Sequence, residues 1–228
     1  IAKAQKDYYY LIPYILAQGF DINFKDDEEK SPLALALRSK NKYKLILTLI
    51  NKGANLFEKN SNNDNLLIVG LKNPDIDYEV GKVLLDKSLR IDECNNFGLD
   101  AFVIALSNVM DPNIISLLIE HGAKVNAEYN GLTPIMYYVM GQASIDILYT
   151  LIKHKANLNA KSKYGLNALI CCLITTGRKD IVKELLNYAP ELKTCKCNSL
   201  TPIQWLKTNQ SVAQNNQQYS TLKYLLLK

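Results

Sequence analysis

The stretch GLTPIMYYVM, residues 131–140, decides how the rest of this chain is interpreted. The related stretch GLNALICCLI follows at residues 165–174, and SLTPIQWLKT follows at residues 199–208, so that a similar motif returns after 34 residues each time. A motif that returns at a fixed period of roughly 20–50 residues is typical of repeat proteins, in which each copy begins one structural unit.

The residue at the threonine position of this motif belongs to one class of side chains in every copy. Successive copies place here Ser31, Asn65, Asp100, Thr133, Asn167 and Thr201, at steps of 34, 35, 33, 34 and 34 residues. Each of these side chains can accept a hydrogen bond from a backbone N–H at the start of a helix. Proline follows three of them, as Pro32, Pro134 and Pro202, and proline fits the first helical position. The sequence therefore predicts that a helix begins after each of the six residues.

A second amphipathic segment follows the first five of these helix starts. These segments cover residues 45–56, 80–91, 114–125, 146–158 and 180–192. Apolar residues recur in them at positions i, i+3 and i+4, which predicts a helix with one buried face. Gly53 and Gly122 lie just past two of the helix ends, where a left-handed backbone favours glycine. Ser88, Lys155 and Ala189 occupy the same position in other copies, and we expect these three to end their helices in another, weaker way.

Together these units resemble ankyrin repeats. The family signature T-P-L-H-x-A is matched by SPLALA at 31–36 and TPIMYY at 133–138, and more weakly by NALICC and TPIQWL. The second helix and its exit are matched by LLIEHGAKVNA at 117–127, LIKHKANLNA at 151–160 and LINKGANL at 49–56. The signature histidine is absent, because Ala34, Val103 and Met136 stand in its place.

The resemblance covers residues 7–228 and implies an all-α fold, a solenoid of about six stacked helix-turn-helix repeats with hairpin-like loops. We expect a single ankyrin-repeat domain over residues 1–228. Its units are predicted at about 1–29, 30–63, 64–97, 98–130, 131–164, 165–197 and 198–228. The unit that contains NLLIVGL lacks both threonine and proline, so its first helix is the least marked.

Both ends of the chain depart from the repeat pattern. Residues 7–23 align with a second helix and its exit, with Gly19 in the place of Gly53, and Pro13 is expected to distort the first turns of that helix. Residues 206–220 predict an extended polar loop before a last helix. We expect Leu225, Leu226 and Leu227 of that helix to be exposed, and Ile1 looks like a cut into a longer protein.

Composition and charge narrow the class of protein. Hydrophobic residues make up 48% and charged residues 21%, which is typical of a folded chain. The net charge of +5 is mild and does not by itself indicate a nucleic acid or membrane partner. We see no apolar run long enough for a membrane span and no signal peptide. The five cysteines, an odd number, indicate free thiols in a reducing compartment, so we expect an intracellular, cytoplasmic protein.

Motifs for catalysis or metal binding are missing from the sequence. His121 and His154 occupy the same place in consecutive repeats, at the end of the second helix, where a cation is favourable. The pairs Cys171–Cys172 and Cys195–Cys197 do not have the spacing of zinc ligands. We therefore predict no enzyme, no catalytic or cofactor-binding residue, no cofactor and no metal within this chain, although an enzyme elsewhere in a longer protein stays open.

A dense basic segment, RSKNKYK at residues 38–44, has two interpretations. It is either a solvated turn between helices or a contact for nucleic acid or acidic lipid. Nucleic acid binding needs clustered Lys and Arg together with aromatic residues, and only this one segment is dense in them, so we prefer the turn.

The resemblance implies that loop tips and first helices form a concave surface that binds a partner. The residues expected to bind there are Asp27, Glu28, Lys30, Asn62, Asp64, Phe97, Tyr129, Tyr137 and Tyr164. Stacked repeats would place the tip aromatics in a row as an apolar anchor, beyond a charged N-terminal part. Alternatively, each ring packs back on its own hairpin. Tyr138, next to Tyr137, falls at a packed position.

We therefore expect a non-catalytic module that binds another protein, whose identity the sequence does not show. One alternative is a scaffold segment of a large cytoskeletal, ciliary or host-targeted assembly, in which the C-terminal leucines dock on the rest of the same chain. Another is a regulatory repeat array attached to an enzyme or a channel. No nucleic acid partner and no membrane span are expected.

Overall fold

The computed structural model describes residues 11–40, 42–87, 89–108, 111–141, 144–196, 199–208 and 223–227. Over these residues the chain forms helices and loops, with isolated bridges in place of strands. The prediction of an all-α fold built from successive helix pairs is confirmed. The chain divides into two compact units, residues 1–105 and 106–228, and each is described by itself. The division into seven repeat segments stays a prediction.

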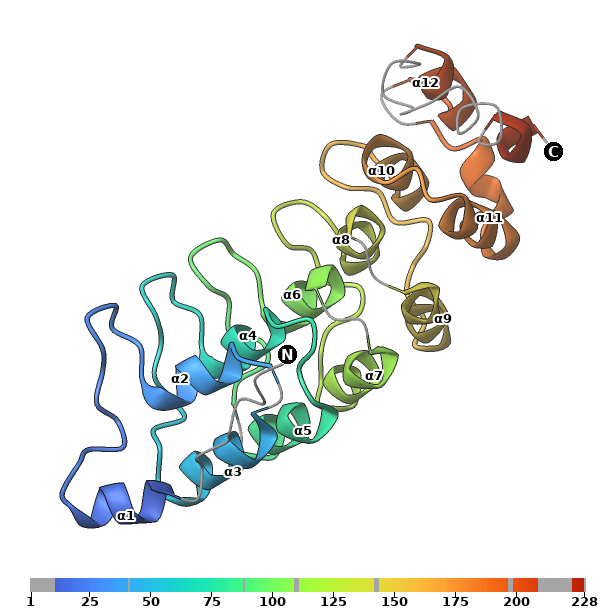
Figure 1. The fold of residues 1–228 in the computed structure, drawn as a ribbon. Coiled ribbons are helices and arrows are strands. Elements are labelled where there is room, and N and C mark those ends of the chain that lie inside the picture. The colour runs from blue at the N-terminus through green and yellow to red at the C-terminus, as the bar shows by residue number, and fades with distance from the viewer. Residues whose placement is uncertain are drawn as a thin grey trace, which may run out of the picture. The chain divides into compact units, whose positions relative to one another are not determined.

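The first unit consists of two rows of helices. Its helices are α1 (Ile12–Ala17), α2 (Pro32–Leu37), α3 (Tyr43–Asn51), α4 (Leu66–Leu71), α5 (Tyr78–Asp86) and the start of α6 (Ala101–Asn108). The first helices α2 and α4 lie side by side, and the second helices α3 and α5 form the other row (Figure 1). Leucines from both rows, among them Leu37, Leu71 and Leu84, are fully buried between them. Stacking thus buries the apolar face that one helix pair could not bury alone.

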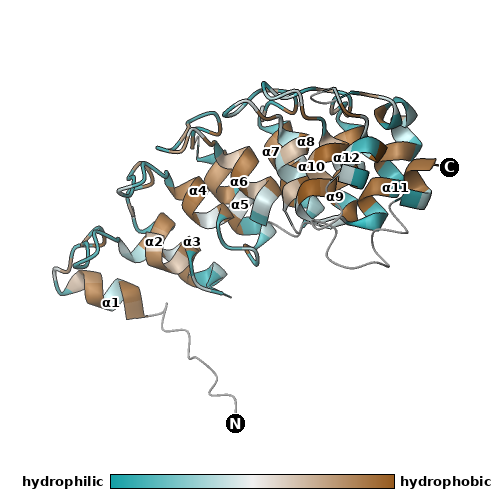
Figure 2. Ribbon diagram, turned by 90° about the horizontal axis from the view of Figure 1, so that it is seen from above, coloured by the Kyte–Doolittle hydropathy of each residue, from teal (hydrophilic) through white to brown (hydrophobic). Residues whose placement is uncertain are grey.

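The second unit repeats this arrangement. It contains α7 (Pro112–Glu120), α8 (Pro134–Met140), α9 (Ile145–Lys153), α10 (Ala168–Thr175), α11 (Lys179–Tyr188), the 3₁₀ helix η2 (Pro190–Lys193) and α12 (Pro202–Thr208). The first helices α8, α10 and α12 follow one another, as do the second helices α7, α9 and α11. Residues 223–227 are also helical. Figure 2 shows that the helices carry most of the hydrophobic residues and that the loops are largely hydrophilic.

Five of the six predicted caps accept a backbone hydrogen bond from the residue three positions later. The side chains of Ser31, Asn65, Asp100, Asn167 and Thr201 do so. Thr133 is the exception. It precedes α8 with extended backbone, but its hydroxyl makes no capping bond and is buried without a hydrogen-bond partner among the described residues. The weakly marked helix in NLLIVGL is present as α4, capped by Asn65 and buried along its whole length.

The second helices end with left-handed backbone at the predicted position. Gly53 and Gly122 have φ of 90° and 97°, and the N–H groups of the next residues bond back to Leu49 and Leu118. Lys155 was expected to differ, but it adopts φ of 61°, and the N–H of the next residue, Ala156, bonds back to Leu151 in the same way. Ala189 does differ, with φ of −141°, because Pro190 follows and the chain continues into η2. Ser88 lies outside the described residues.

Two expectations about the chain ends are wrong. For Pro13 this holds only in part, because it lies in the first turn of α1, where its missing N–H has no cost, and its effect on earlier turns stays a prediction since residues 1–10 lie outside the described residues. Leu226 is only 6% exposed, whereas Leu227 is 65% exposed, so the C-terminal leucines are not exposed as a set. The proposed loop after residue 206 begins later, since α12 extends to Thr208, and residues 209–220 lie outside the described residues.

Candidate partner-binding groove

Four loops that precede first helices share one construction. The side chains of Asp26, Asn60, Asn95 and Ser162 each accept hydrogen bonds from the backbone N–H groups two and four residues later. The first residue of each loop also donates its own N–H to the carbonyl four residues later. Side chains that bond to nearby backbone in this way replace regular secondary structure in a tight turn. The loop tips are therefore fixed relative to the helices that follow them.

The residue two positions before each cap has left-handed backbone in all six copies. Their φ angles lie between 59° and 83°, and the residues are Glu29, Asn63, Gly98, Gly131, Gly165 and Ser199. The same conformation returns although three of the six are not glycine. The backbone geometry of the tip is thus preserved where the residue type is not.

The loop at Tyr129 is one residue shorter than the others. Tyr129 and Leu132 exchange both backbone hydrogen bonds, at 2.8 and 2.9 Å, around Asn130 and Gly131. Both central residues have positive φ, 52° and 83°, as in the two-residue hairpin turns that Asn-Gly favours. Tyr129 therefore occupies the closing position of the hairpin, and its side chain is only 9% exposed. Of the two interpretations given for the tip aromatics, Tyr129 fits the one in which the ring packs back on its own hairpin.

A pocket of about 340 Å³ lies in the first unit where loop tips and first helices meet. One wall comes from residues 28–30 and 58–62 of two loops, and the other from Arg38, Lys72 and Asn73 at the ends of α2 and α4. Ala34, Leu66 and Val69 contribute apolar groups between these walls. We refer to this pocket as the groove.

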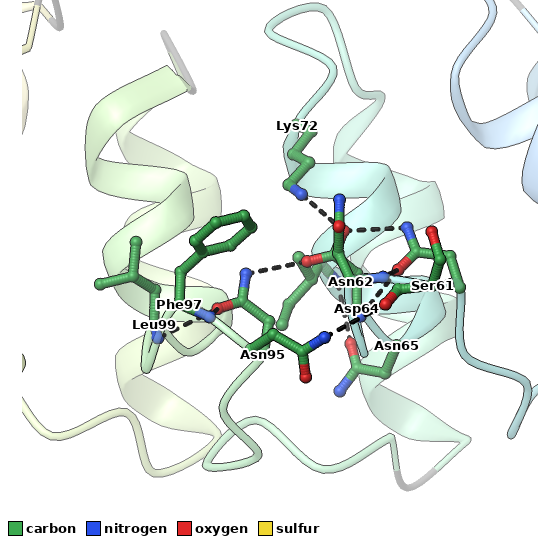
Figure 3. Close-up of polar contacts among 11 residues, drawn as sticks. Ser61, Asn62, Asp64, Asn65, Lys72, Asn95, Phe97 and Leu99 are labelled. Atoms are coloured by element: carbon green, nitrogen blue, oxygen red, sulfur yellow. Dashed lines mark hydrogen bonds and ion pairs between the residues drawn. The ribbon is translucent and has the colours of Figure 1, made fainter.

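Asp64 organises one side of the groove although it is itself buried. Its side chain is 1% exposed, and its two oxygens accept bonds from Lys72, Asn60 and Asn95 at 2.5, 2.9 and 2.8 Å. Figure 3 shows Asp64 between Lys72 and Asn95, with the Lys72 side chain reaching back toward the loop. Asp64 was predicted to bind the partner, but its carboxylate is buried and already bonds Lys72, Asn60 and Asn95, so a direct partner contact by Asp64 stays a prediction.

The pKa of Asp64 reflects this arrangement. Burial raises the pKa, but the hydrogen bonds from Lys72, Asn95 and Asn60 lower it by more, so that it lies below its ordinary value of 3.8. Asp64 is therefore ionised at neutral pH and holds the positive charge of Lys72 over the groove.

Most other charged groups of the groove also have partners. Lys30 pairs with Glu28, and Lys59 donates to Glu93 at 2.6 Å. Glu58 accepts a hydrogen bond from the Ser31 hydroxyl. Arg38, in contrast, is exposed and its side chain has no hydrogen-bond or ion-pair partner among the described residues.

The remaining predicted binding residues are placed as follows. Glu28, Lys30 and Asn62 line the groove, whereas Asp27 is exposed at the same tip but does not line it. Phe97 and Tyr164 are 60% and 56% exposed on their loops. A row of these two rings with Tyr129 stays a prediction. A partner contact by any of these residues also stays a prediction.

Two first helices of the second unit, α8 and α10, carry apolar rather than charged groups at the positions of Arg38 and Lys72. Met140 and Ile174 stand there, both partly exposed. Tyr137 is half-buried and donates its hydroxyl proton to the carbonyl oxygen of Tyr129 at 3.1 Å. The neighbouring Tyr138 is buried, as predicted, and donates to the carbonyl of Ser144.

The histidines and cysteines have structural places. His121 and His154 are the C-cap residues of α7 and α9, as predicted, and His121 Nδ1 lies 2.9 Å from the carbonyl oxygen of Leu117. Cys171 and Cys172 are buried in α10, where burial raises the pKa of the Cys172 thiol. Cys197 lies outside the described residues. In the described part of the chain, three or more His, Cys, Asp or Glu side chains nowhere gather into a possible metal site.

The sequence reasoning missed the far wall of the groove. Arg38 and Lys72 each stand seven residues after a cap, at the C-cap of a first helix. Long side chains on helices extend toward the N-terminus, so both can reach over their own helix toward the loops. Marking the position seven residues after each cap, in addition to the tips, would have found them.

The comparisons with known proteins agree with this geometry. The family model described as ankyrin repeats (3 copies) matches residues 73–162 and 102–196, which together make up more than half of the chain. The chain belongs to the ankyrin repeat family. The ankyrin repeat fold is thereby shown for this chain, and ankyrin repeats are in general protein–protein interaction modules.

Individual ankyrin repeat proteins of large DNA viruses resemble the chain. The fowlpox virus (strain NVSL) ankyrin repeat protein FPV031 is 25% identical over 206 residues, covering 87% of this chain and 50% of that protein. The variola virus ankyrin repeat protein B18 is 27% identical over 205 residues, covering 78% of this chain and 36% of that protein. The chain thus spans half the length or less of these relatives.

A solved structure shows the same fold. The crystal structure of the ankyrin repeat domain of Bcl-3, described as a unique member of the IkappaB protein family, is 21% identical with a TM-score of 0.64. The match covers 96% of this chain and 92% of that chain. At this identity the likeness supports the fold alone. Among the described residues, no helix has the length and apolar character needed to cross a membrane.

Proposed function

We propose that this ankyrin repeat chain binds a partner protein through the surface formed by loop tips and first helices, with the groove of the first unit as its centre. The observation that carries the proposal is the groove itself. It lies where two fixed loops face the ends of α2 and α4, and it combines charged walls with an apolar floor. Concave sites of this kind, with a few fixed polar groups, are common binding sites.

The fixed loops support the proposal on energetic grounds. In each of the two loops that line the groove, one side-chain oxygen accepts two hydrogen bonds from backbone N–H groups of the same loop. Binding would therefore not require these loops to become ordered. A surface that is already in its bound conformation loses less entropy on association. We further propose that the chain acts in the cytoplasm, in keeping with the thiols of Cys94, Cys172 and Cys195, which form no disulfide among the described residues.

A blocked groove tests the proposal. Ala34→Arg places a long side chain in the groove, while Asn51→Arg adds the same side chain to an exposed position of α3 outside it. Proteins captured from a lysate by the parent chain would be identified, purified and measured for direct binding to both variants. We expect binding to be lost with Ala34→Arg and kept with Asn51→Arg, with both variants folded by circular dichroism. Equal binding to both variants would show that the partner uses another surface.

The other interpretations, a scaffold segment of a large assembly and a regulatory array attached to an enzyme or channel, concern the longer protein. They stay predictions beside the one proposed here.

A further inference from the structure

The first two repeats of the first unit differ in charge at one of two equivalent positions. The caps Ser31 and Asn65 are 34 residues apart, so Lys30 is equivalent to Asp64, and Arg38 is equivalent to Lys72. In the second repeat, the cation at the end of α4 pairs with the buried carboxylate of Asp64 at 2.5 Å. In the first repeat both positions carry a positive charge. The first repeat therefore has no carboxylate at the position that Asp64 occupies beside Lys72 in the second repeat.

The carboxylates near Arg38 in the first repeat either bond to other groups or do not line the groove. Glu28 pairs with Lys30, and Glu29 lies 3.7 Å from Lys25. Asp26 uses one carboxylate oxygen for the backbone N–H groups of residues 28 and 30. The exposed carboxylate of Asp27 stands at the tip and does not line the groove. Arg38 therefore remains the charged residue of the groove whose side chain has no partner among the described residues.

Arg38 is accessible from the groove, because it is exposed at the end of α2 and lines the pocket. A guanidinium group offers several N–H donors in a plane that matches the two oxygens of a carboxylate. A ligand that suits Arg38 and the neighbouring Lys30 position therefore carries an acidic group.

We propose that the groove binds a polypeptide segment through one acidic side chain, which pairs with Arg38 beside Lys30 as Asp64 pairs with Lys72 one repeat later. This inference rests on the proposed function and names the chemistry of the partner at that site.

The probe is a random-sequence library of short peptides displayed on phage and selected on the whole chain. Enriched peptides are synthesised, and their affinities are measured by fluorescence anisotropy for the parent chain, Arg38→Gln and Ala34→Arg. Arg90→Gln is the matched control, because Arg90 is an exposed arginine of the same unit that does not line the groove.

We expect peptides that Ala34→Arg blocks to contain Asp or Glu. Arg38→Gln should weaken their binding about tenfold, which corresponds to about 1.4 kcal/mol, and Arg90→Gln should leave it unchanged. Replacing the acidic residue by its amide should cost the same, and the two changes together should cost no more than either alone, because both remove one interaction.

Two results would overturn the inference. If the peptides that Ala34→Arg blocks bind Arg38→Gln as well as the parent, the groove is a binding site without the acidic anchor, and the proposed function stands. If selection returns no peptide that Ala34→Arg blocks, the groove does not select such segments, and the proposed function is then judged by its own capture experiment.

Discussion

The loop at Asn95 and the loop at Tyr129 both lead into a first helix, but the second is one residue shorter, and the aromatic residues of the two loops differ in burial. In the longer loop, the side chain of Asn95 bonds the backbone of Phe97 and Leu99, and Phe97 is left outside, 60% exposed. In the shorter loop, an Asn-Gly turn closes directly on Tyr129, which is buried. An aromatic residue near a tip is thus a surface group or a core group according to loop length.

The largest effect is expected from removing the buried ring. Tyr129→Ala should lower the free energy of unfolding by about 3 kcal/mol, because it empties a well-packed site. Phe97→Ala should change it by no more than about 0.5 kcal/mol, since that ring is exposed. Urea denaturation of both variants measures the difference. Equal losses would show that the two aromatic residues play the same role after all.

The next effect concerns the side chains that link the longer loops to one another. Asp64→Ala should cost about 2 kcal/mol, below the range for fully buried pairs, because Lys72 remains partly in water. It also leaves Asn60 and Asn95 without an acceptor. Asp27→Ala, at the exposed tip of the preceding loop, is the control and should be neutral. A neutral Asp64→Ala would mean that the network does not stabilise the loops.

A smaller difference is expected between the caps that follow the two kinds of loop. Asn65→Ala removes a capping bond to the N–H of Ile68 and should cost about 1 kcal/mol. Thr133→Ala should be nearly neutral, because its hydroxyl makes no capping bond and is buried without a partner among the described residues. Thermal melting of the two variants compares them, and a larger loss for Thr133→Ala would contradict the different cap geometry.

The smallest effect is expected from acid. Because the pKa of Asp64 is lowered on folding, the unfolded chain binds its proton first as the pH falls. The stability that Asp64 contributes is therefore complete above the ordinary value of 3.8 and is lost as the pH drops through the lowered pKa. Denaturation of the parent and of Asp64→Asn at neutral and acidic pH should show their difference shrinking in acid. A difference that grows in acid would mean that the pKa is raised instead.

These comparisons also bear on the two first-helix surfaces. The positions of Arg38 and Lys72 in the first unit correspond to Met140 in α8 and Ile174 in α10, so charged and apolar side chains occupy the same position of the repeat. The repeat fold accepts either choice, because the side chains at this position are exposed or partly exposed. Differences of this kind set which partner a repeat surface accepts.

The sequence by itself determined the repeat and the starts of its first helices. Six capping residues at nearly constant spacing placed every first helix, and Gly53 and Gly122 placed the ends of second helices, since these signals act within a few residues along the chain. Even the helix in NLLIVGL, whose motif is degenerate, begins where its asparagine predicted.

The tertiary structure alone decided which polar and aromatic tip residues are available to a partner. Asp64 and Tyr129 resemble exposed loop residues in the sequence, but both are buried. Asp64 is buried because Asn95, 31 residues away, and Lys72 meet on its carboxylate. Tyr129 is buried because a shorter turn brings it into the hairpin. Contacts between neighbouring repeats join residues about one period apart, and a local pattern does not contain them.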